Sequence, residues 1–212
     1  MKIPKQPNKT ELNNFKNKLI LDKKIYYNKD FYPPILLDLY NLFYIIILNK
    51  RFNILEFGTG FSTLVLSHAL KFNEIRNQNI NFNKLGIYNP FRIYVIDDQK
   101  KYINISKKRF SNYKKSEYIK PNFLLTSCNL KLIDNQICNE YSRLPNFLPD
   151  FIYVDGPDTN NITNSINGLN ISKNKNFMPM NSDILKFENY LLPGTIIVID
   201  GRYHNAFFLK NN

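Results

Sequence analysis

Cysteine is scarce in this sequence of 212 residues, which contains only Cys128 and Cys138. Two cysteines are too few for the disulfide framework of a small secreted domain. They also lack the CxxC or Cys/His spacing that a zinc site needs. We therefore expect a chain that folds without disulfides or zinc, in a reducing, cytoplasmic setting.

Long hydrophobic runs are lacking as well. The most apolar segment runs from Ile35 to Leu48, and Asp38 and Asn41 interrupt it. A bilayer needs about 20 apolar residues, so this shorter segment is better interpreted as a buried helix. The first 18 residues are polar and carry no apolar stretch of the kind found in secretory signals. The sequence thus predicts neither a membrane span nor a secretory leader.

Negative charge is also in short supply, because 17 acidic residues face 29 lysines and arginines, for a formal net charge of +12. A basic surface can attract nucleic acid, anionic membranes or acidic substrates. Here the lysines are scattered, and only residues 100–120 resemble a patch, without the signature of an RNA-recognition or helix-turn-helix motif. Because Asn, Lys and Ile are abundant throughout, as in proteins from AT-rich genomes, we interpret the charge as compositional and expect no nucleic-acid partner.

The sequence does contain short apolar runs that alternate with helical segments. The runs cover residues 53–57, 92–96, 122–126, 150–154 and 195–199, and the helical segments cover residues 35–48, 62–71, 100–110 and 183–191. Near-continuous apolar strands that alternate with helices are typical of a parallel sheet covered on both faces. We expect a polar lead over residues 1–34, then one α/β domain over residues 35–212, built as a doubly wound, mostly parallel sheet with helices on both faces.

Four of these predicted strands end in acidic residues. Glu56 and Gly58 close the first strand, Asp97 the second, Asp155 the fourth and Asp200 the fifth. In open α/β sheets, ligands bind outside the carboxyl ends of the strands, near the point where the strand order reverses. The sequence therefore predicts a functional site on this edge of the sheet.

The turn after the first strand reads Glu-Phe-Gly-Thr-Gly-Phe-Ser over residues 56–62. Gly58 and Gly60 let the backbone turn sharply and approach a ligand, and the next helix points its N-terminal amides at that ligand. A dinucleotide fingerprint would have a third glycine where Thr63 stands, and Glu56 would repel a pyrophosphate. An acid at this position suits a cationic ligand instead.

This order of motifs resembles the Rossmann-like S-adenosylmethionine-dependent methyltransferases, from about Ile35 to the end of the chain. The family's first motif is an acid followed by Gly-x-Gly, its second strand ends in a ribose-binding acid, and its fourth ends in an acid near the transferred methyl group. The resemblance implies S-adenosylmethionine as the cofactor. The residues that it implies as binding the cofactor are Glu56, Gly58, Thr59, Gly60, Ser62, Asp97, Asp98, Asn129 and Asp155.

Within the resemblance, Asn129 or Ser127 would take the place of the acid that meets the adenine amine in relatives. Catechol-type members of the family hold a divalent cation with two strand-end acids and an Asn. Gly201 stands where that Asn would be, so no metal is expected. The family also continues past its fifth strand with a helix and an antiparallel strand pair. Because this chain ends at Asn212, we expect a short sheet with an exposed edge, or a fragment.

The candidates for catalysis are Asp155, Asp200 and His204. The two aspartates should end neighbouring strands. His204 lies four residues after Asp200 and could act as the general base that deprotonates an acceptor hydroxyl. The simpler interpretations are a turn carboxylate for Asp200 and a surface histidine at a helix start for His204.

The function implied by the resemblance is methyl transfer to a small-molecule or glycan-linked acceptor, by O-methylation. Two alternatives remain open at this point. One is an oxidoreductase that binds a nicotinamide or another nucleotide through a variant turn, and the other is a binding module without activity. The sequence specifies neither the acceptor nor the oligomeric state.

Overall fold

The computed structural model describes residues 1–19, 33–158, 161–171 and 180–212. The α-helices are α1 (Lys9–Lys18), α3 (Leu36–Leu48), α4 (Phe61–Arg76), α5 (Lys100–Arg109) and α6 (Tyr203–Asn211). The strands are β1 (Asn53–Phe57), β2 (Arg92–Asp97), β3 (Asn122–Leu125), β4 (Cys128–Ile133), β5 (Gln136–Tyr141), β6 (Phe151–Val154), β7 (Met180–Asn181) and β8 (Ile196–Ile199). Short 3₁₀ turns are η1 (Phe82–Leu85), η2 (Phe110–Asn112), η4 (Asp183–Lys186) and η5 (Glu188–Tyr190). No helix of the described residues is long and apolar enough to cross a membrane.

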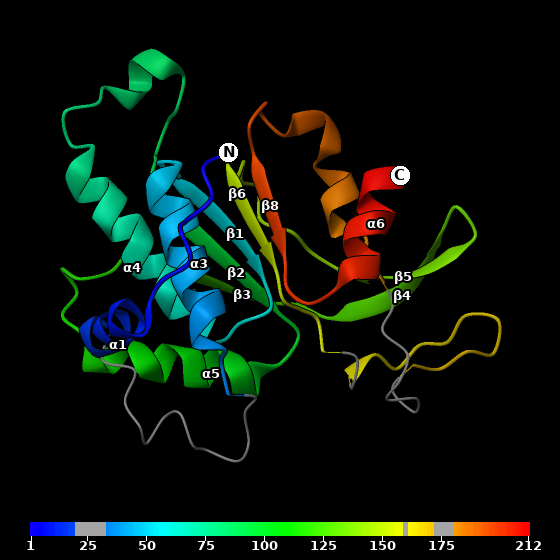
Figure 1. Cartoon of the computed structure of the whole chain (residues 1–212). Helices are drawn as coiled ribbons and strands as arrows, with labels where there is room; N and C mark the ends of the chain where they lie inside the picture. The colour runs from blue at the N-terminus through cyan, green and yellow to red at the C-terminus, as the bar shows by residue number, and fades with distance from the viewer. Residues whose placement is uncertain (20–32, 159–160, 172–179) are drawn as a thin grey trace.

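The main sheet has five strands in the order β3-β2-β1-β6-β8, and every pair in it is parallel (Figure 1). The chain moves outward from β1 through β2 to β3, then returns to β6 on the other side of β1. The expected doubly wound α/β fold is therefore confirmed, and its topological switch point lies between β1 and β6. The two edges are β3 and β8.

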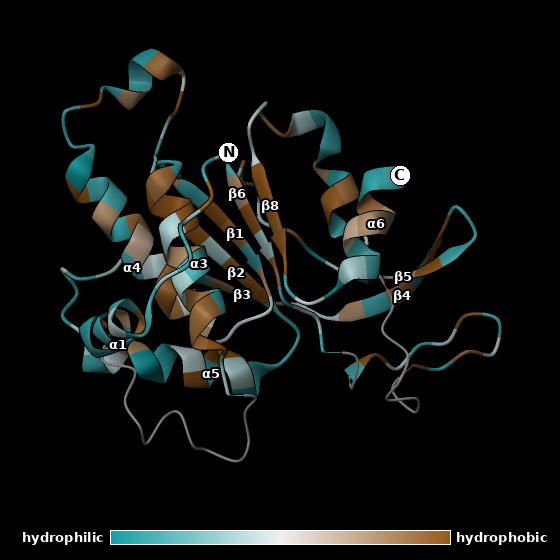
Figure 2. Ribbon diagram, viewed as in Figure 1, coloured by the Kyte–Doolittle hydropathy of each residue, from teal (hydrophilic) through white to brown (hydrophobic). Residues whose placement is uncertain are grey.

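The strands of the main sheet are mostly hydrophobic (Figure 2), and their alternating side chains divide the core into two layers. In β1, Ile54 packs into the cluster that includes α3 and α4, whereas Leu55 and Phe57 pack into the opposite cluster. Because successive side chains of a strand point to opposite faces, each apolar strand contributes to both layers. This explains why the strands have near-continuous apolar sequences.

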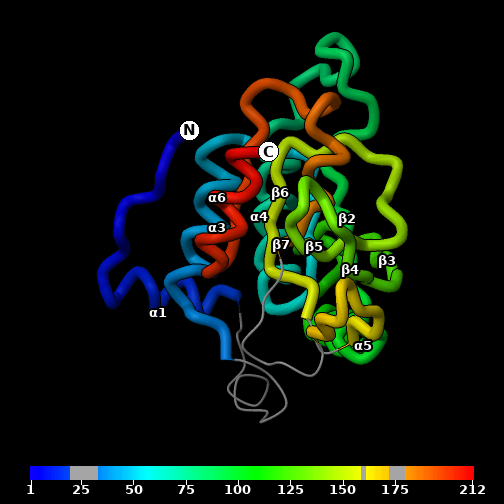
Figure 3. The backbone as a smooth tube through the Cα atoms, turned by 90° about the vertical axis from the view of Figure 1, so that its right-hand side faces the viewer, coloured from blue at the N-terminus to red at the C-terminus, as the bar shows by residue number. Residues whose placement is uncertain are grey.

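The first layer consists of helices. α3 and α4 pack against each other on this face, and the expected buried helix over residues 35–48 is confirmed as α3. α1 lies on the outer side of α3 (Figure 3), where the Phe15 ring meets Tyr40 and Phe43 edge-on at centroid distances of 5.4 and 5.5 Å. The segment expected as a polar lead thus adds one aromatic side chain to the core.

The second layer differs from the alternation of strands and helices that the sequence predicts. This face of the main sheet is covered by the β4–β5 hairpin, the short strand β7, the turns η4 and η5, and Leu209 of α6. The predicted helix over residues 183–191 is wrong, because this segment forms two separate 3₁₀ turns. Its buried residues Ile184 and Phe187 are three apart, which suits the three-residue period of a 3₁₀ turn.

The hairpin directly follows β3 and was not anticipated. Its strands are joined by Asp134 and Asn135, which have φ values of 46° and 62°. A two-residue hairpin loop needs positive φ at both positions, and Asp and Asn tolerate this conformation. The Asp-Asn pair between two runs of alternating apolar residues was therefore the available sequence signal.

Candidate functional site at the carboxyl edge of the sheet

Because all five strands of the main sheet are parallel, their carboxyl ends meet on one edge. This edge collects Glu56 from β1, Asp97 from β2, and Asp155 and Asp200, which follow β6 and β8. Asp97 and Asp155 both raise the pKa of Glu56, and Asp200 raises the pKa of Asp155, so the four carboxyl groups lie within electrostatic reach of one another. The sequence-based expectation that these strand ends share one edge agrees with this arrangement.

The turns after β1 and β6 are in direct backbone contact at the switch point. Gly58 has a φ of +91°, and a Cβ atom added to it would lie 2.8 Å from the amide nitrogen of Gly156. The carbonyl oxygen of Phe57 accepts hydrogen bonds from the amides of Asp155 and Gly156, at 2.8 and 2.7 Å. Gly58 is therefore required by this contact, a reason different from the close approach to a ligand that the sequence suggested.

Gly60 is in a different situation. Its φ of −160° corresponds to extended backbone, which any residue can adopt. A Cβ atom added to Gly60 would lie 3.5 Å from the Ser62 Oγ and 4.0 Å from the Asp155 Oδ2. The amide of Gly60 donates a 3.2 Å hydrogen bond to the Thr63 hydroxyl, which also lies 3.0 Å from the hydroxyl of Thr59. This part of the turn therefore leaves room beside the Asp155 carboxyl group.

Glu56 is fully buried beneath the first turn of α4. The Ser62 hydroxyl donates to its Oε1 at 2.5 Å, and the Thr63 hydroxyl donates to its Oε2 at 2.7 Å. Burial raises the pKa of Glu56 to about 8, although these two hydrogen bonds lower it. These two hydrogen bonds connect Glu56 of β1 to Ser62 and Thr63 of α4. Both oxygens of the Glu56 carboxyl group therefore already have partners within the protein.

Asp97 is buried at the end of β2. Its carboxylate accepts the amide of Gln99 at 2.7 Å and is also bonded by the amide of Thr59. Burial is the main cause that raises the pKa of Asp97 to about 7, and the neighbouring Asp98 raises it further. Burial likewise raises the pKa of Asp98 to about 6, with Asp158 adding to the effect. Several carboxyl groups are thus concentrated at the ends of β1 and β2.

The carboxyl groups of Asp155 and Asp200 are hydrogen-bonded to each other. Burial and this contact raise the pKa of Asp155 above its ordinary value. Arg202 partly offsets the shift, and its guanidinium donates to the carbonyl oxygens of Asp155, Gly156 and Pro157 at 3.4, 3.4 and 3.0 Å. Asp38 at the start of α3 also lies close enough for Asp200 to raise its pKa, after the larger effect of burial.

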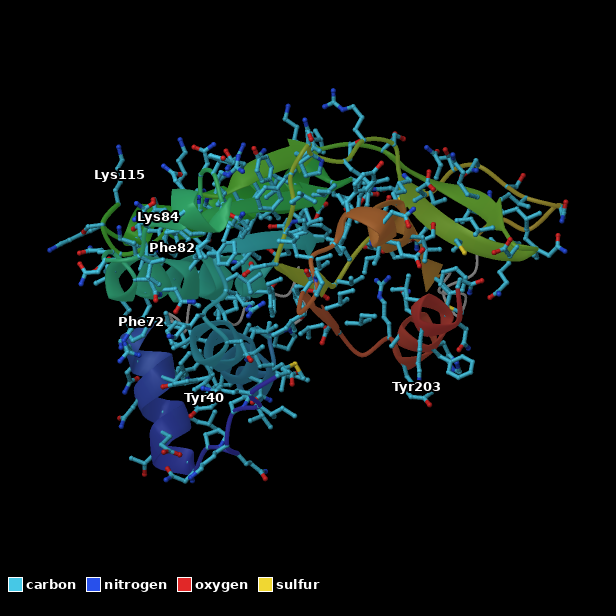
Figure 4. All side chains as sticks on the ribbon, turned by 90° about the horizontal axis from the view of Figure 1, so that it is seen from above. Tyr40, Phe72, Phe82, Lys84, Lys115 and Tyr203 are labelled. Atoms are coloured by element: carbon cyan, nitrogen blue, oxygen red, sulfur yellow. The ribbon has the colours of Figure 1, made fainter. Side chains whose placement is uncertain are left out.

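His204 and Asn129 lie apart from these groups. His204 is an exposed residue of α6 whose ring contacts Tyr203 at 5.9 Å, and Tyr203 points away from the helix into solvent (Figure 4). Within the described residues, no hydrogen bond or ion pair joins His204 to Asp155 or Asp200. Asn129 lies on β4, where its amide donates to the Ser142 hydroxyl at 3.1 Å.

Sequence reasoning missed two features of this edge. Tyr141, at the end of β5, is fully buried next to Gly156, and only the hairpin brings it there. Asp38 interrupts the apolar segment of α3, and that interruption was the signal that could have placed it at the site. In the part of the chain that the structure describes, no group of three His, Cys, Asp or Glu residues is arranged to hold a metal ion.

Two cavities of the described residues lie away from this edge, on the helical side of the molecule. One of about 280 Å³ is lined by Ile3, Pro4, Gln6, Leu37, Asn41 and Ile45. The other, of about 370 Å³, lies where α1 and α4 meet the segment after α5, next to His68 and Tyr113. We place the candidate site at the carboxyl edge because the strand-end acids converge there.

The sequence matches no protein-family model and no curated protein. Several solved structures are similar to this chain. The O-methyltransferase TomG from Streptomyces achromogenes, in complex with SAM, is 13% identical, with a TM-score of 0.40 over 70% of this chain and 60% of TomG. The O-methyltransferase from Bacillus cereus in complex with SAH is 16% identical, with a TM-score of 0.42 over 97% of this chain and 73% of that one. The SAH-bound Podospora anserina methyltransferase PaMTH1 is 13% identical, with a TM-score of 0.43 over 99% of this chain and 77% of that one.

This chain therefore spans about three fifths of the length of TomG. The ligands named for these structures are properties of those proteins.

Proposed function

We propose that this chain is an S-adenosylmethionine-dependent methyltransferase that acts on a small-molecule or glycan-linked acceptor, by O-methylation. The observation that carries the proposal is the concentration of carboxyl groups around the switch point. Asp97 and Asp155 raise the pKa of Glu56, Asp98 raises that of Asp97, and Asp200 raises that of Asp155. Two arginines lie within electrostatic reach of these acids: Arg109 interacts with Glu56, and Arg202 interacts with Asp155 and donates to backbone carbonyls. A ligand that brings positive charge and hydroxyl groups would relieve this crowding, whereas a pyrophosphate would increase it.

The residues at this edge suit the chemistry of S-adenosylmethionine. The Asp97 carboxylate could accept hydrogen bonds from the two ribose hydroxyls, with Asp98 beside it. Thr59 and Gly60 precede the N-terminus of α4, where helix amides favour a carboxylate such as that of the amino-acid moiety. Gly60 adjoins the Asp155 carboxyl group, which would favour a cationic group. When bound, the cofactor supplies an electrophilic methyl group on a sulfonium.

The chain's own part in catalysis would be to orient the acceptor and to take up its proton. Alignment of the acceptor with the methyl group supplies much of the rate in such a reaction. Asp155, whose pKa is raised by burial and by Asp200, suits a general base that accepts the proton of a hydroxyl group, and Asp200 is a second candidate beside it. His204 is a third candidate base, because α6 begins three residues after Asp200.

The same acidic edge supports a neutral or cationic acceptor rather than a nucleic acid, whose phosphates it would repel. The two cysteines are buried and free, which agrees with a reducing, cytoplasmic setting. We propose no metal in the reaction, because the expected Asn ligand is replaced by Gly201.

Calorimetry with S-adenosylhomocysteine, NADH and ATP tests the proposal. S-adenosylhomocysteine should bind, and NADH and ATP should not. Asp97→Asn should weaken binding at least roughly tenfold, because a charge-assisted hydrogen bond to the ribose is lost. Asp134→Asn is the matched control, since it makes the same change in an exposed hairpin loop. Binding of NADH would support an oxidoreductase, and binding of none of the three would support a module without this activity.

A further inference from the structure

Tyr141 is held in one place by its backbone and by its ring. Its amide donates to both carboxylate oxygens of the buried Asp183, at 3.2 and 3.0 Å. Its ring stacks on Phe57 at the end of β1, with centroids 5.9 Å apart and an interplanar angle of 20°. The hydroxyl group therefore has a defined position at the root of the hairpin, next to the end of β1.

This hydroxyl group is buried without a hydrogen-bond partner among the described residues. It lies 3.1 Å from the position that a Cβ atom of Gly156 would take, and the backbone of Gly58 borders the same position. Burial is the main cause that raises the pKa of the phenol, followed by the charges of Asp97, Cys128 and Asp98. The carboxyl groups of Asp97 and Asp98 are therefore within electrostatic reach of the hydroxyl. The hydroxyl thus points at the carboxyl edge, where the turns after β1 and β6 meet.

A buried hydroxyl group without a partner is costly, and native proteins almost always satisfy it. The polar side chains of the neighbouring hairpin positions bond to one another. The hydroxyls of Ser127 and Ser142 lie 2.7 Å apart, and the amide of Asn129 donates to Ser142. Ser127 and Asn129 are the residues that the sequence suggested for the nucleobase, whereas the buried hydroxyl of Tyr141 has no hydrogen-bond partner in the described part of the chain.

We propose that the hydroxyl group of Tyr141 is a hydrogen-bonding partner for the nucleoside part of the ligand that binds at the carboxyl edge. This inference rests on the proposed function. The nucleoside is favoured because the strand paired with Tyr141 starts beside Asp97, the candidate ribose-binding residue. The amide of Thr126 donates to the carbonyl oxygen of Asp97 at 3.1 Å, and Cys128, two residues later, pairs with Tyr141. A phenol can donate and accept, so it can pair with either kind of polar atom on a nucleoside.

The test compares Tyr141→Phe with the control Tyr94→Phe. Tyr94 packs into the same layer of the core, with its ring 4.7 Å from that of Phe147. Calorimetry with S-adenosylhomocysteine and with 5′-methylthioadenosine, which keeps the nucleoside but lacks the amino-acid part, should show about a tenfold loss of affinity for both in Tyr141→Phe. Tyr94→Phe should bind both ligands as the wild type does.

Thermal unfolding without ligand separates this role from a structural one. Because the hydroxyl has no partner to lose among the residues that the structure describes, Tyr141→Phe should keep or raise the Tm of the ligand-free protein. Unchanged affinity together with a lowered Tm would overturn the inference, since the hydroxyl would then be satisfied by a structural water. A loss confined to S-adenosylhomocysteine would also overturn it, because the contact would then involve the amino-acid part. If the wild type binds neither ligand, the proposed function fails and this inference fails with it.

Discussion

Gly58 and Gly156 pack backbone against backbone at the point where the strand order of the sheet reverses. A Cβ atom on Gly58 would lie 2.8 Å from the Gly156 amide nitrogen, and one on Gly156 would lie 2.7 Å from the Gly58 Cα. The two turns can approach this closely only because both residues lack a Cβ atom. The contact joins the turn after β1 to the turn after β6. The two glycines of the first motif consequently have different roles, since Gly60 makes no such contact.

Alanine substitutions at Gly58 and Gly60 should separate these roles. Gly58→Ala should destabilise the fold by about 3 kcal/mol, because the new methyl group meets rigid backbone and the φ of +91° is strained for alanine. Gly60→Ala should fold normally and weaken the binding of S-adenosylhomocysteine, since its methyl group would occupy space beside Asp155. Thermal unfolding and calorimetry measure the two effects. Equal Tm values for both variants would contradict the assignment.

Glu56 should make the protein less stable as the pH rises. Its pKa is about 8 in the folded state against an ordinary value of 4.5, so between these values the folded state binds more protons than the unfolded state. The free energy of unfolding then falls by up to about 1.4 kcal/mol per pH unit from this group. Glu56→Gln should flatten the decline measured by urea unfolding between pH 5 and pH 8.

The control for this experiment is Glu188→Gln, which removes an exposed carboxylate and should leave the decline unchanged. Asp97, Asp98 and Asp155 also have raised pKa values and contribute a decline of the same sign. Some pH dependence should therefore remain in Glu56→Gln. A decline as steep as that of the wild type would show that Glu56 is ionised in the folded protein.

Substitution of the carboxyl pair should affect turnover unequally. Asp155→Ala should lower turnover about 100-fold or more, the usual range for loss of a general base, and Asp200→Ala should have a smaller effect because its side chain is exposed. Release of S-adenosylhomocysteine in the presence of a panel of hydroxylated small molecules is the measurement. Turnover should rise with pH through the raised pKa of Asp155, because only the ionised Asp155 carboxylate accepts a proton.

EDTA should leave the same turnover unchanged. The reason is that Gly201 replaces the third ligand that a divalent cation would need beside the two aspartates. Activity that EDTA abolishes and Mg²⁺ restores, with both aspartates essential, would show that the protein depends on a cation.

The excess of basic residues should produce only weak binding of nucleic acid. Lysines such as Lys84 and Lys115 project separately into solvent (Figure 4). Binding of duplex RNA or DNA, measured by fluorescence anisotropy, should be weak at low salt and fall steeply as salt increases. Tight binding at physiological salt would instead indicate a nucleic-acid acceptor.

Local sequence patterns predicted the main sheet well. The apolar runs over residues 53–57 and 92–96 became β1 and β2, since a strand buried on both faces needs apolar residues at nearly every position. Parallel pairing then brings every carboxyl end to one edge, which is why the sequence alone could predict that the strand-end acids lie together. The hairpin and the 3₁₀ turns escaped prediction because their alternating pattern and three-residue spacing are short and weak signals.

The sequence by itself determined which strands form, that their ends carry acids, and that a glycine turn precedes a helix. Only the tertiary structure decided that Gly58 serves the contact with Gly156, that both oxygens of Glu56 are taken by α4, and that Tyr141 lies at the site. These relationships join segments more than 80 residues apart or depend on which way a buried side chain points. Local propensity and periodicity carry no information about such contacts, because they arise only when separate elements pack together.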